Sequence, residues 1–261
     1  MTLLMARARL RGLLVLGFAA LTMVAFFLLS LPAMLLTGSG DFPMWLARRL
    51  WCPLCLWVSG CPRRVEPHPA LPDGPLLFAS NHESALDIWV LVEQLPRSVR
   101  FVAKRELFRI PVFGWYLRLG GHVGVDRTNR ARAIESLRKA ATLVRGGTSL
   151  IVFPEGTRSG DGRVQPFKKG PFALALEAQV PIVPVAVSGS GAVTPRGLIA
   201  VWPGPIRMAM GEAVDPAAYP DRRALLTLVR SRIIDLHRSI GGKGGALDGP
   251  EAAPGAEGVR V

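Results

Sequence analysis

The chain has 261 residues, 32 lysines and arginines against 19 aspartates and glutamates, a net charge of +13 and a mean hydropathy of +0.30. This length fits one large domain or two small ones. A basic, apolar chain favours an anionic membrane surface as partner. The basic residues are dispersed and form no aromatic-studded motif, which argues against a nucleic-acid partner.

A long apolar segment lies near the N-terminus. Gly12–Leu36 is uncharged and apolar except for Thr22 and Ser30, and it exceeds the ~20 residues that cross a bilayer core. A secretory signal peptide is the alternative reading, but its apolar region would be too long and no small-x-small cleavage site follows. We therefore expect a membrane segment, broken at Pro32 and again at residues 38–40.

A second apolar segment follows at residues 43–58 and contains Arg48 and Arg49. It is predicted to be an interfacial helix whose arginines reach lipid headgroups. Arginines also precede the first segment, so the positive-inside rule selects no orientation. A membrane crossing and a helical hairpin embedded from one face both fit. Residues 1–60 are predicted to form this N-terminal anchor.

Three cysteines, Cys52, Cys55 and Cys61, lie close together. The nearest histidine is His68 and there is no second cysteine pair, so a zinc site is disfavoured and no metal is expected. Buried, reduced thiols are the expected state.

Residues 61–240 are predicted to form one α/β domain, entered through a linker at residues 61–75. Runs of apolar residues and turn signals predict strands and helices in alternation, which indicates a mainly parallel sheet flanked by helices. The tail, residues 241–261, is rich in glycine, alanine and proline and is expected to be disordered. The expected strands are Leu76–Ala79, Val99–Ala103, His122–Val125, Ser149–Phe153, Ile182–Ser188 and Leu198–Trp202, and the expected helices are Asp87–Gln94, Phe113–Leu119, Arg130–Arg145, Pro171–Glu177 and Arg222–His237.

A polar stretch containing His82 and Asp87 follows the first expected strand. A neutral imidazole takes a proton from a hydroxyl near pH 7, and a carboxylate on its other nitrogen fixes the tautomer. Five residues on a helix are about 140° apart, so the pair works only if His82 lies in the turn and Asp87 in the first helical turn. The alternative is an ordinary helix start capped by Ser80 or Asn81.

A second polar cluster, Phe153–Ser159, also follows an expected strand. Gly156 allows the backbone to approach a ligand, and Arg158 is suited to bidentate contact with a phosphate. Thr157 adds a hydroxyl, and Glu155 is expected to orient Arg158 or the turn. An ordinary polar turn is the alternative. Further cations, each also compatible with a solvated surface, are Lys104 and Arg127.

These clusters, with Gly121–Arg127 and Val180–Val185, resemble in order and spacing the motifs of the glycerolipid acyltransferase family, above all its 1-acyl-sn-glycerol-3-phosphate acyltransferases. The first block is matched by Asn81-His82-x4-Asp87 and the third by Phe153–Ser159. The resemblance covers residues 75 to 215. One departure is His122, a polar residue within the second block to which the resemblance gives no role.

The resemblance implies that His82 is a general base on the free hydroxyl of a lysophospholipid and that Asp87 orients it. The hydroxyl would attack the thioester of acyl-CoA or acyl-carrier protein, without an acyl-enzyme or a cofactor. The implied acceptor is lysophosphatidic acid and the product phosphatidic acid, made at the cell inner membrane with the catalytic domain on the cytoplasmic face. The implied substrate-binding residues are Lys104, Arg127, Glu155, Gly156, Thr157 and Arg158.

Other functions are weighed against this one. Another lyso-lipid, such as lyso-ornithine lipid, is an alternative acceptor, because Arg158 and Arg127 fit a phosphate without excluding a carboxylate. A lipase would carry Gly-x-Ser-x-Gly, which is absent. A non-enzymatic lipid binder would tolerate the loss of His82, whereas an acyltransferase would not.

Overall fold

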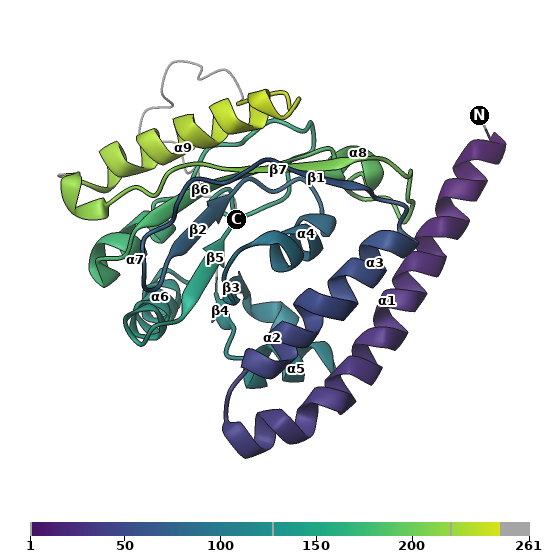
Figure 1. Ribbon diagram of the computed structural model, residues 1–261, viewed down its shortest axis with the longest axis horizontal. Helices are drawn as coiled ribbons and strands as arrows, with labels where there is room; N and C mark the ends of the chain where they lie inside the picture. Colours follow the sequence, from purple (N-terminus) through teal and green to yellow (C-terminus); the bar gives the residue numbers. More distant parts are fainter. Residues whose placement is uncertain (1, 127, 220, 246–261) are drawn as a thin grey trace, which may run out of the picture.

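The computed structural model describes residues 2–126, 128–219 and 221–245, in which a helical hairpin lies against an α/β domain (Figure 1). Within these residues, seven strands form one sheet in the order β1-β7-β6-β2-β5-β3-β4. Neighbouring strands are parallel except β6 and β7, so the mainly parallel sheet is confirmed. The strands are β1 (Arg63–Val65), β2 (Leu77–Ser80), β3 (Val99–Lys104), β4 (Val123–Val125), β5 (Ser149–Val152), β6 (Ile182–Ser188) and β7 (Ile206–Met210).

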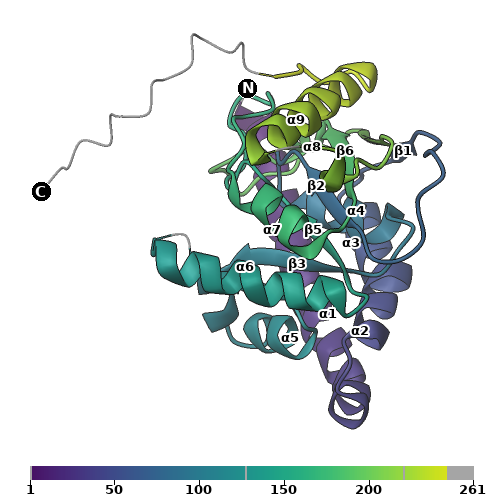
Figure 2. The same ribbon diagram turned by 90° about the vertical axis from the view of Figure 1, so that its left-hand side faces the viewer.

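Helices cover both faces of the sheet, as Figures 1 and 2 show. On one face, Phe78 and Ile151 belong to the same buried cluster as Val90 of α4. On the other, Leu77 and Leu150 pack with residues of α6, α7 and α9. Alternate residues of each strand therefore feed two separate cores. The helices of the domain are α4 (Leu86–Gln94), η2 (Arg105–Arg109), α5 (Phe113–Leu119), α6 (Arg130–Arg145), α7 (Gly170–Ala178), α8 (Ser190–Val193), η3 (Pro216–Ala218) and α9 (Arg222–Ser239).

The N-terminal hairpin pairs α1 (Thr2–Thr37) with a continuous helical run made of α2 (Asp41–Leu46), η1 (Ala47–Trp51) and α3 (Cys52–Val58). The break expected at Pro32 is wrong, because the helix continues through it. A proline removes one backbone hydrogen bond, and α1 nevertheless runs on to Thr37. The chain reverses where Gly38 adopts a φ of 61°. These helices therefore form a hairpin, with its turn at residues 38–40.

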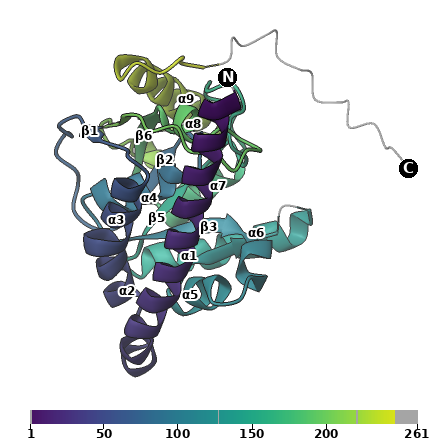
Figure 3. The same ribbon diagram turned by 90° about the vertical axis from the view of Figure 1, so that its right-hand side faces the viewer.

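Helix α1 lies along the domain instead of standing free (Figure 3). The backbone N–H of Val201 donates to the carbonyl of Ala8 at 2.9 Å, and the indole of Trp51 donates to Thr22 Oγ1 at 3.0 Å. At Gly12, a Cβ would come within 2.8 Å of the Ala200 backbone. One narrow stripe of α1 is thus buried: Ala8, Val15, Ala19, Phe27, Ser30 and Met34.

The opposite face of α1 is exposed and rich in leucine. Leucines recur every seven residues along it, at Leu14, Leu21, Leu28 and Leu35, each more than half exposed. Among the described residues, Leu3–Thr37 is the one helix long and apolar enough to cross a membrane by length and composition.

The strand expected at Leu198–Trp202 is wrong. This segment is irregular, and it is the surface on which the start of α1 docks through Val201. An apolar run indicates burial, but the burying partner here is a helix more than 180 residues earlier. Two real strands were not predicted. β7 has the helix-favouring residues Met and Ala, and β1 lies within the expected linker.

The chain beyond α9 still contacts the domain. Gly245 forms a β-bridge with Val164, and the Gly244 N–H donates to Nδ1 of His237 at 3.1 Å. Residues 241–245 therefore pack against the fold, whereas the rest of the expected disordered tail, residues 246–261, lies outside the described residues. The expected buried thiols are confirmed at Cys52, Cys55 and Cys61.

Candidate active site

His82 and Asp87 meet at the carboxyl end of β2. The Nδ1 atom of His82 lies 2.8 Å from Asp87 Oδ2. His82 is in the turn after the strand, and Asp87 is the second residue of α4, which is the geometry that the spacing requires. Because the carboxylate accepts from Nδ1–H, the remaining nitrogen, Nε2, carries a lone pair. The pair therefore forms an oriented general base.

Asp87 is a fully buried carboxylate that four donors surround. The backbone N–H groups of Glu83 and Ser84 donate to its Oδ2 at 2.7 and 2.9 Å, beside His82. The hydroxyl of Ser190 donates to its Oδ1. A buried carboxylate stays charged only when such donors replace its water. The sequence did not indicate Ser190, which lies 103 residues away.

The loop after β5 fixes the backbone and ring of His82. The His82 N–H donates to Glu155 Oε1 at 2.9 Å, and its carbonyl accepts from the Ser159 N–H at 2.7 Å. The ring stacks on Phe153 with centroids 3.9 Å apart. On the other side, the side chain of Asn81 forms two hydrogen bonds of 2.8 Å with the backbone of Val187. These contacts hold the imidazole in one orientation.

Glu155 is buried behind His82. It does not line the cavity that opens beside His82, which is described below. Burial raises its pKa to about 8, and the carboxylates of Asp87 and Glu83 add to the effect. The group is therefore protonated at neutral pH. The sequence placed Glu155 with the substrate-binding residues, but its side chain supports the histidine loop.

A cavity of about 480 Å³ opens beside His82. Its lining is mostly apolar and comes from β3, η2, α4, α5 and the hairpin. The polar lining includes four of the residues expected to bind substrate: Lys104, Gly156, Thr157 and Arg158. A cavity of this kind, apolar with a few polar groups, is typical of a site for a small amphiphilic molecule. Arg127 lies outside the described residues.

Lys168, a cation that the sequence analysis did not single out, packs against Gly156. The φ of Gly156 is 72°, and a Cβ on this glycine would lie 2.8 Å from Lys168 Cε. The Lys168 side chain therefore lies directly against the loop that carries Thr157 and Arg158. The signal available in the sequence was the pair Lys168-Lys169, which lies nine and ten residues after Ser159.

Helix α9 also contacts the histidine loop. Glu83 is buried, and its Oε1 lies 2.9 Å from Nε2 of His237, which is completely buried. The N–H of Gly191 donates to Glu83 Oε2 at 3.1 Å. Since the Gly244 N–H donates to Nδ1 of His237, the ring proton sits on Nε2 and is donated to Glu83. No local pattern in the sequence indicates this pair.

His122, for which the sequence offered no role, is also buried. Its Nδ1 accepts a hydrogen bond from the Phe101 N–H at 3.0 Å. Burial, with the nearby Arg100 cation, lowers the pKa of His122 to about 3. The ring is therefore neutral, and it joins β4 to β3.

Comparison with known proteins places this site in context. A family model described as Acyltransferase matches residues 63–188. The chain is 36% identical over 201 residues to a chloroplastic 1-acyl-sn-glycerol-3-phosphate acyltransferase of Brassica napus, covering 73% of this chain and 56% of the relative. It is 35% identical over 158 residues to a 1-acyl-sn-glycerol-3-phosphate acyltransferase of Saccharomyces cerevisiae, covering 59% and 52%.

A solved structure is similar over nearly the whole chain. It is the crystal structure of the 1-acyl-sn-glycerophosphate acyltransferase PlsC of Thermotoga maritima, with a TM-score of 0.78 and 27% sequence identity. The match covers 90% of this chain and 95% of that one. The chain spans about half the length of the curated relatives that it matches.

Proposed function

Because the chain belongs to the acyltransferase family, we propose that it transfers a fatty acyl group from acyl-CoA or acyl-carrier protein to the sn-2 hydroxyl of lysophosphatidic acid, giving phosphatidic acid. The observation that carries this proposal is the His82–Asp87 pair on the wall of an apolar cavity that is also lined by Thr157 and Arg158. An oriented base, an apolar space and cations beside it are what an anionic, single-chain lipid acceptor requires.

In this reaction, Nε2 of His82 takes the proton of the acceptor hydroxyl as its oxygen attacks the thioester carbonyl carbon. The tetrahedral intermediate then expels the thiolate, which takes the proton back from the imidazolium. Asp87 keeps the ring in the required tautomer and stabilises its transient positive charge. In this proposal the acyl group passes directly from donor to acceptor, without a covalent enzyme intermediate.

The acceptor's phosphate is assigned to the loop after β5. Arg158 and the hydroxyl of Thr157 lie on the cavity wall, with Lys168 against Gly156. Lys104 lines the same cavity and is paired with Glu106 at 3.6 Å. Arg127 belongs to this proposed set by its place in the sequence.

Membrane attachment is part of the proposal. The leucine-rich face of α1, with the exposed Trp45 and Trp57 of the second helical run, supplies an apolar surface for a membrane. We assign residues 1–60 to the anchor and residues 61–240 to the catalytic domain. Since acyl thioesters are cytoplasmic, we place the domain on the cytoplasmic face of the cell inner membrane.

The first experiment is an acyl-transfer assay with the full chain in detergent, a labelled acyl thioester and a panel of lyso-lipids. Wild-type protein is expected to acylate lysophosphatidic acid, and His82→Ala is expected to lose this activity without loss of folding. The matched control is His68→Ala, which removes an exposed histidine outside the site.

An active His82→Ala variant would overturn the general-base assignment. Acylation of lyso-ornithine lipid in place of lysophosphatidic acid would keep the mechanism and replace the acceptor. Accumulation of an acyl-enzyme with a thioester donor would contradict direct transfer.

A further inference from the structure

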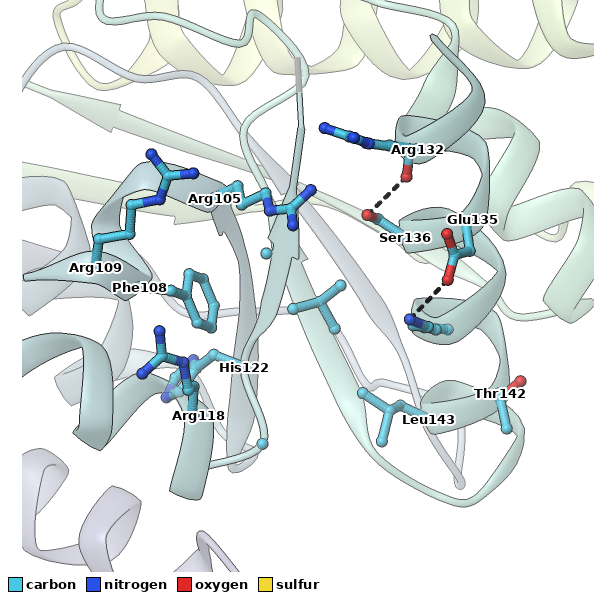
Figure 4. A pocket seen from close by; sticks show the side chains of 14 residues that line it. Arg105, Phe108, Arg109, Arg118, His122, Arg132, Glu135, Ser136, Thr142 and Leu143 are labelled. Carbon is cyan, nitrogen blue, oxygen red and sulfur yellow. Dashed lines mark hydrogen bonds and ion pairs between the residues drawn. The ribbon is translucent and has the colours of Figure 1, made fainter. Parts of the chain in front are cut away.

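A second cavity, of about 880 Å³, lies along the free edge of β4. We call it the β4 groove. Figure 4 shows Arg105, Arg109 and Arg118, from η2 and α5, on one side of the strand. Arg132 and Glu135 of α6 lie on the other side. Three elements, η2, α5 and α6, therefore form the groove around the edge strand β4.

The side chains that line the β4 groove are strongly basic. Only one of the charged groups is a carboxylate, that of Glu135, and it is paired with Lys139 at 2.8 Å. The net charge of the lining is therefore positive by four. The five cations are Arg105, Arg109, Arg118, Arg132 and Lys139.

Part of this charge is already compensated and part is not. Arg105 and Arg132 each lie 3.5 Å from Oδ2 of Asp126. No carboxylate among the described residues forms an ion pair with Arg109 or Arg118, and both are exposed. Two unpaired guanidinium groups in one concave surface are suited to a ligand with several phosphate oxygens.

The β4 groove is adjacent to the candidate active site. The segment that separates them is Lys104–Arg109: Lys104 and Leu107 line the cavity beside His82, whereas Arg105, Phe108 and Arg109 line the groove. His122 borders both spaces. Lys104, at the end of β3, lines the catalytic cavity, and the next residue, Arg105, lines the groove. The Lys104–Arg109 segment is therefore a wall that the groove and the catalytic cavity share.

We propose that the β4 groove binds the phosphates of the 3′-phospho-ADP end of CoA, so that the thioester arm reaches His82 over the Lys104–Arg105 boundary. This inference rests on the proposed acyl transfer and names its donor. The volume of the β4 groove lies within the range of about 300–1,000 Å³ that small-molecule sites occupy. A carrier protein would instead bury roughly 800 Å² of each partner's surface. A concave, cationic groove fits the nucleotide better.

The test uses the full chain with Arg109→Gln and Arg118→Gln combined. For acyl-CoA, KM is expected to rise about tenfold or more, while kcat and the KM for lysophosphatidic acid stay as in the wild type. With acyl-pantetheine, which lacks the nucleotide phosphates, the double variant and the wild type are expected to be equally poor. The matched control is Arg138→Gln with Arg222→Gln, two exposed arginines outside the groove.

A second measurement separates this inference from the proposed function. Calorimetric titration with CoA alone needs no acceptor, and binding is expected in the wild type and the control but lost in the Arg109/Arg118 variant. This result would support the groove even if lysophosphatidic acid were not acylated.

Four results would overturn the inference. One is unchanged CoA binding in the double variant, and another is an equal KM rise for acyl-CoA and acyl-pantetheine. The third is the loss of binding to phosphatidylglycerol vesicles with CoA binding intact, which would make the groove a lipid headgroup site. Transfer from acyl-carrier protein alone, with no CoA bound, would overturn the groove assignment and leave the acyl-transfer proposal standing.

Discussion

At the scale of single residues, the site depends on how a buried carboxylate is kept in place. Asp87 accepts from His82, from two backbone N–H groups and from Ser190. Three of these donors come from the turn between β2 and α4, which explains why the spacing of His82 and Asp87 was readable from sequence. The fourth comes from α8, and only the folded chain reveals it.

Asp87→Asn is expected to lower kcat by about 10³–10⁴-fold, because an amide favours the wrong histidine tautomer. Ser190→Ala removes one of four donors and is expected to lower kcat by less, about tenfold or under, without changing the KM for lysophosphatidic acid. Steady-state kinetics on the purified variants checks both. Equal losses in the two variants would contradict the division of roles.

Glu155 gives the site a pH-dependent stability. Its pKa is raised from 4.5 to about 8, so between these values the folded protein holds a proton that the unfolded chain has lost. The stability from this group is therefore fully present below pH 4.5 and is lost as pH rises through 8. Glu155→Gln mimics the protonated acid and is expected to flatten the fall in Tm between pH 6 and 8.5. Melting curves in detergent would contradict this if wild type and variant fell in parallel.

At the scale of elements, helix α9 is tied to the catalytic loop through His237 and Glu83. Both side chains are buried, and the donated Nε2–H is the link between them. Removing one member of a buried hydrogen-bonded pair leaves the other unsatisfied.

His237→Ala is accordingly expected to cost about 1–3 kcal/mol of stability. A fall in kcat should accompany it, because Glu83 neighbours His82. His237→Gln, which retains an N–H donor, is expected to recover part of both. Thermal melting and kinetics on the two variants check this. Wild-type kcat in His237→Ala would show that α9 does not position the loop.

Gly12 permits the close approach between α1 and the segment at Ala200. Gly12→Leu is expected to separate them and lower Tm by several degrees. The control is Gly17→Leu, at a position with no atom within 4 Å of an added Cβ. A similar Tm change in both variants would mean that the packing of Gly12 is unimportant.

The same elements show where sequence reasoning succeeds. β2, β5 and β6 are buried on both faces and are continuous apolar runs, so they were found to within a residue or two. The segment at Leu198–Trp202 is also apolar, yet the helix that packs against Ala200 and Val201 is far away in sequence. The same holds for Glu83 with His237, and for the β4 groove, whose cations come from three elements. Local chemistry was predictable, and long-range pairing was not.

At the scale of the whole molecule, the hairpin is both the proposed anchor and part of the core. Met44 and Leu56 of the second helical run belong to the same buried cluster as Phe78 and Val90. Deleting residues 1–60 would therefore uncover one face of the sheet and would not simply release the domain. At about 1.5 Å per residue, α1 is about 54 Å long, well beyond a bilayer core of ~30 Å. Its packing along the domain favours embedding from one face over a crossing.

Membrane attachment is better tested on the exposed face of α1. Replacing Leu14, Leu21 and Leu28 with Gln is expected to shift most of the protein from sedimented vesicles to the supernatant, because three exposed apolar side chains leave the lipid. The control is Ile134→Gln, an exposed apolar residue on α6. Sedimentation unchanged from the wild type would place the membrane contact elsewhere.

The contact between Glu83 and His237 also orders events on the ribosome. The two residues are separated by 154 positions. Both ring nitrogens of His237 have hydrogen-bond partners only once the Gly244 N–H donates to Nδ1. At about 5–20 residues per second, translation takes on the order of ten seconds to pass from the first to the second. During that interval the histidine loop has no support from α9. The proposed anchor is therefore made first, and the candidate active site is completed only after the C-terminal helix has emerged.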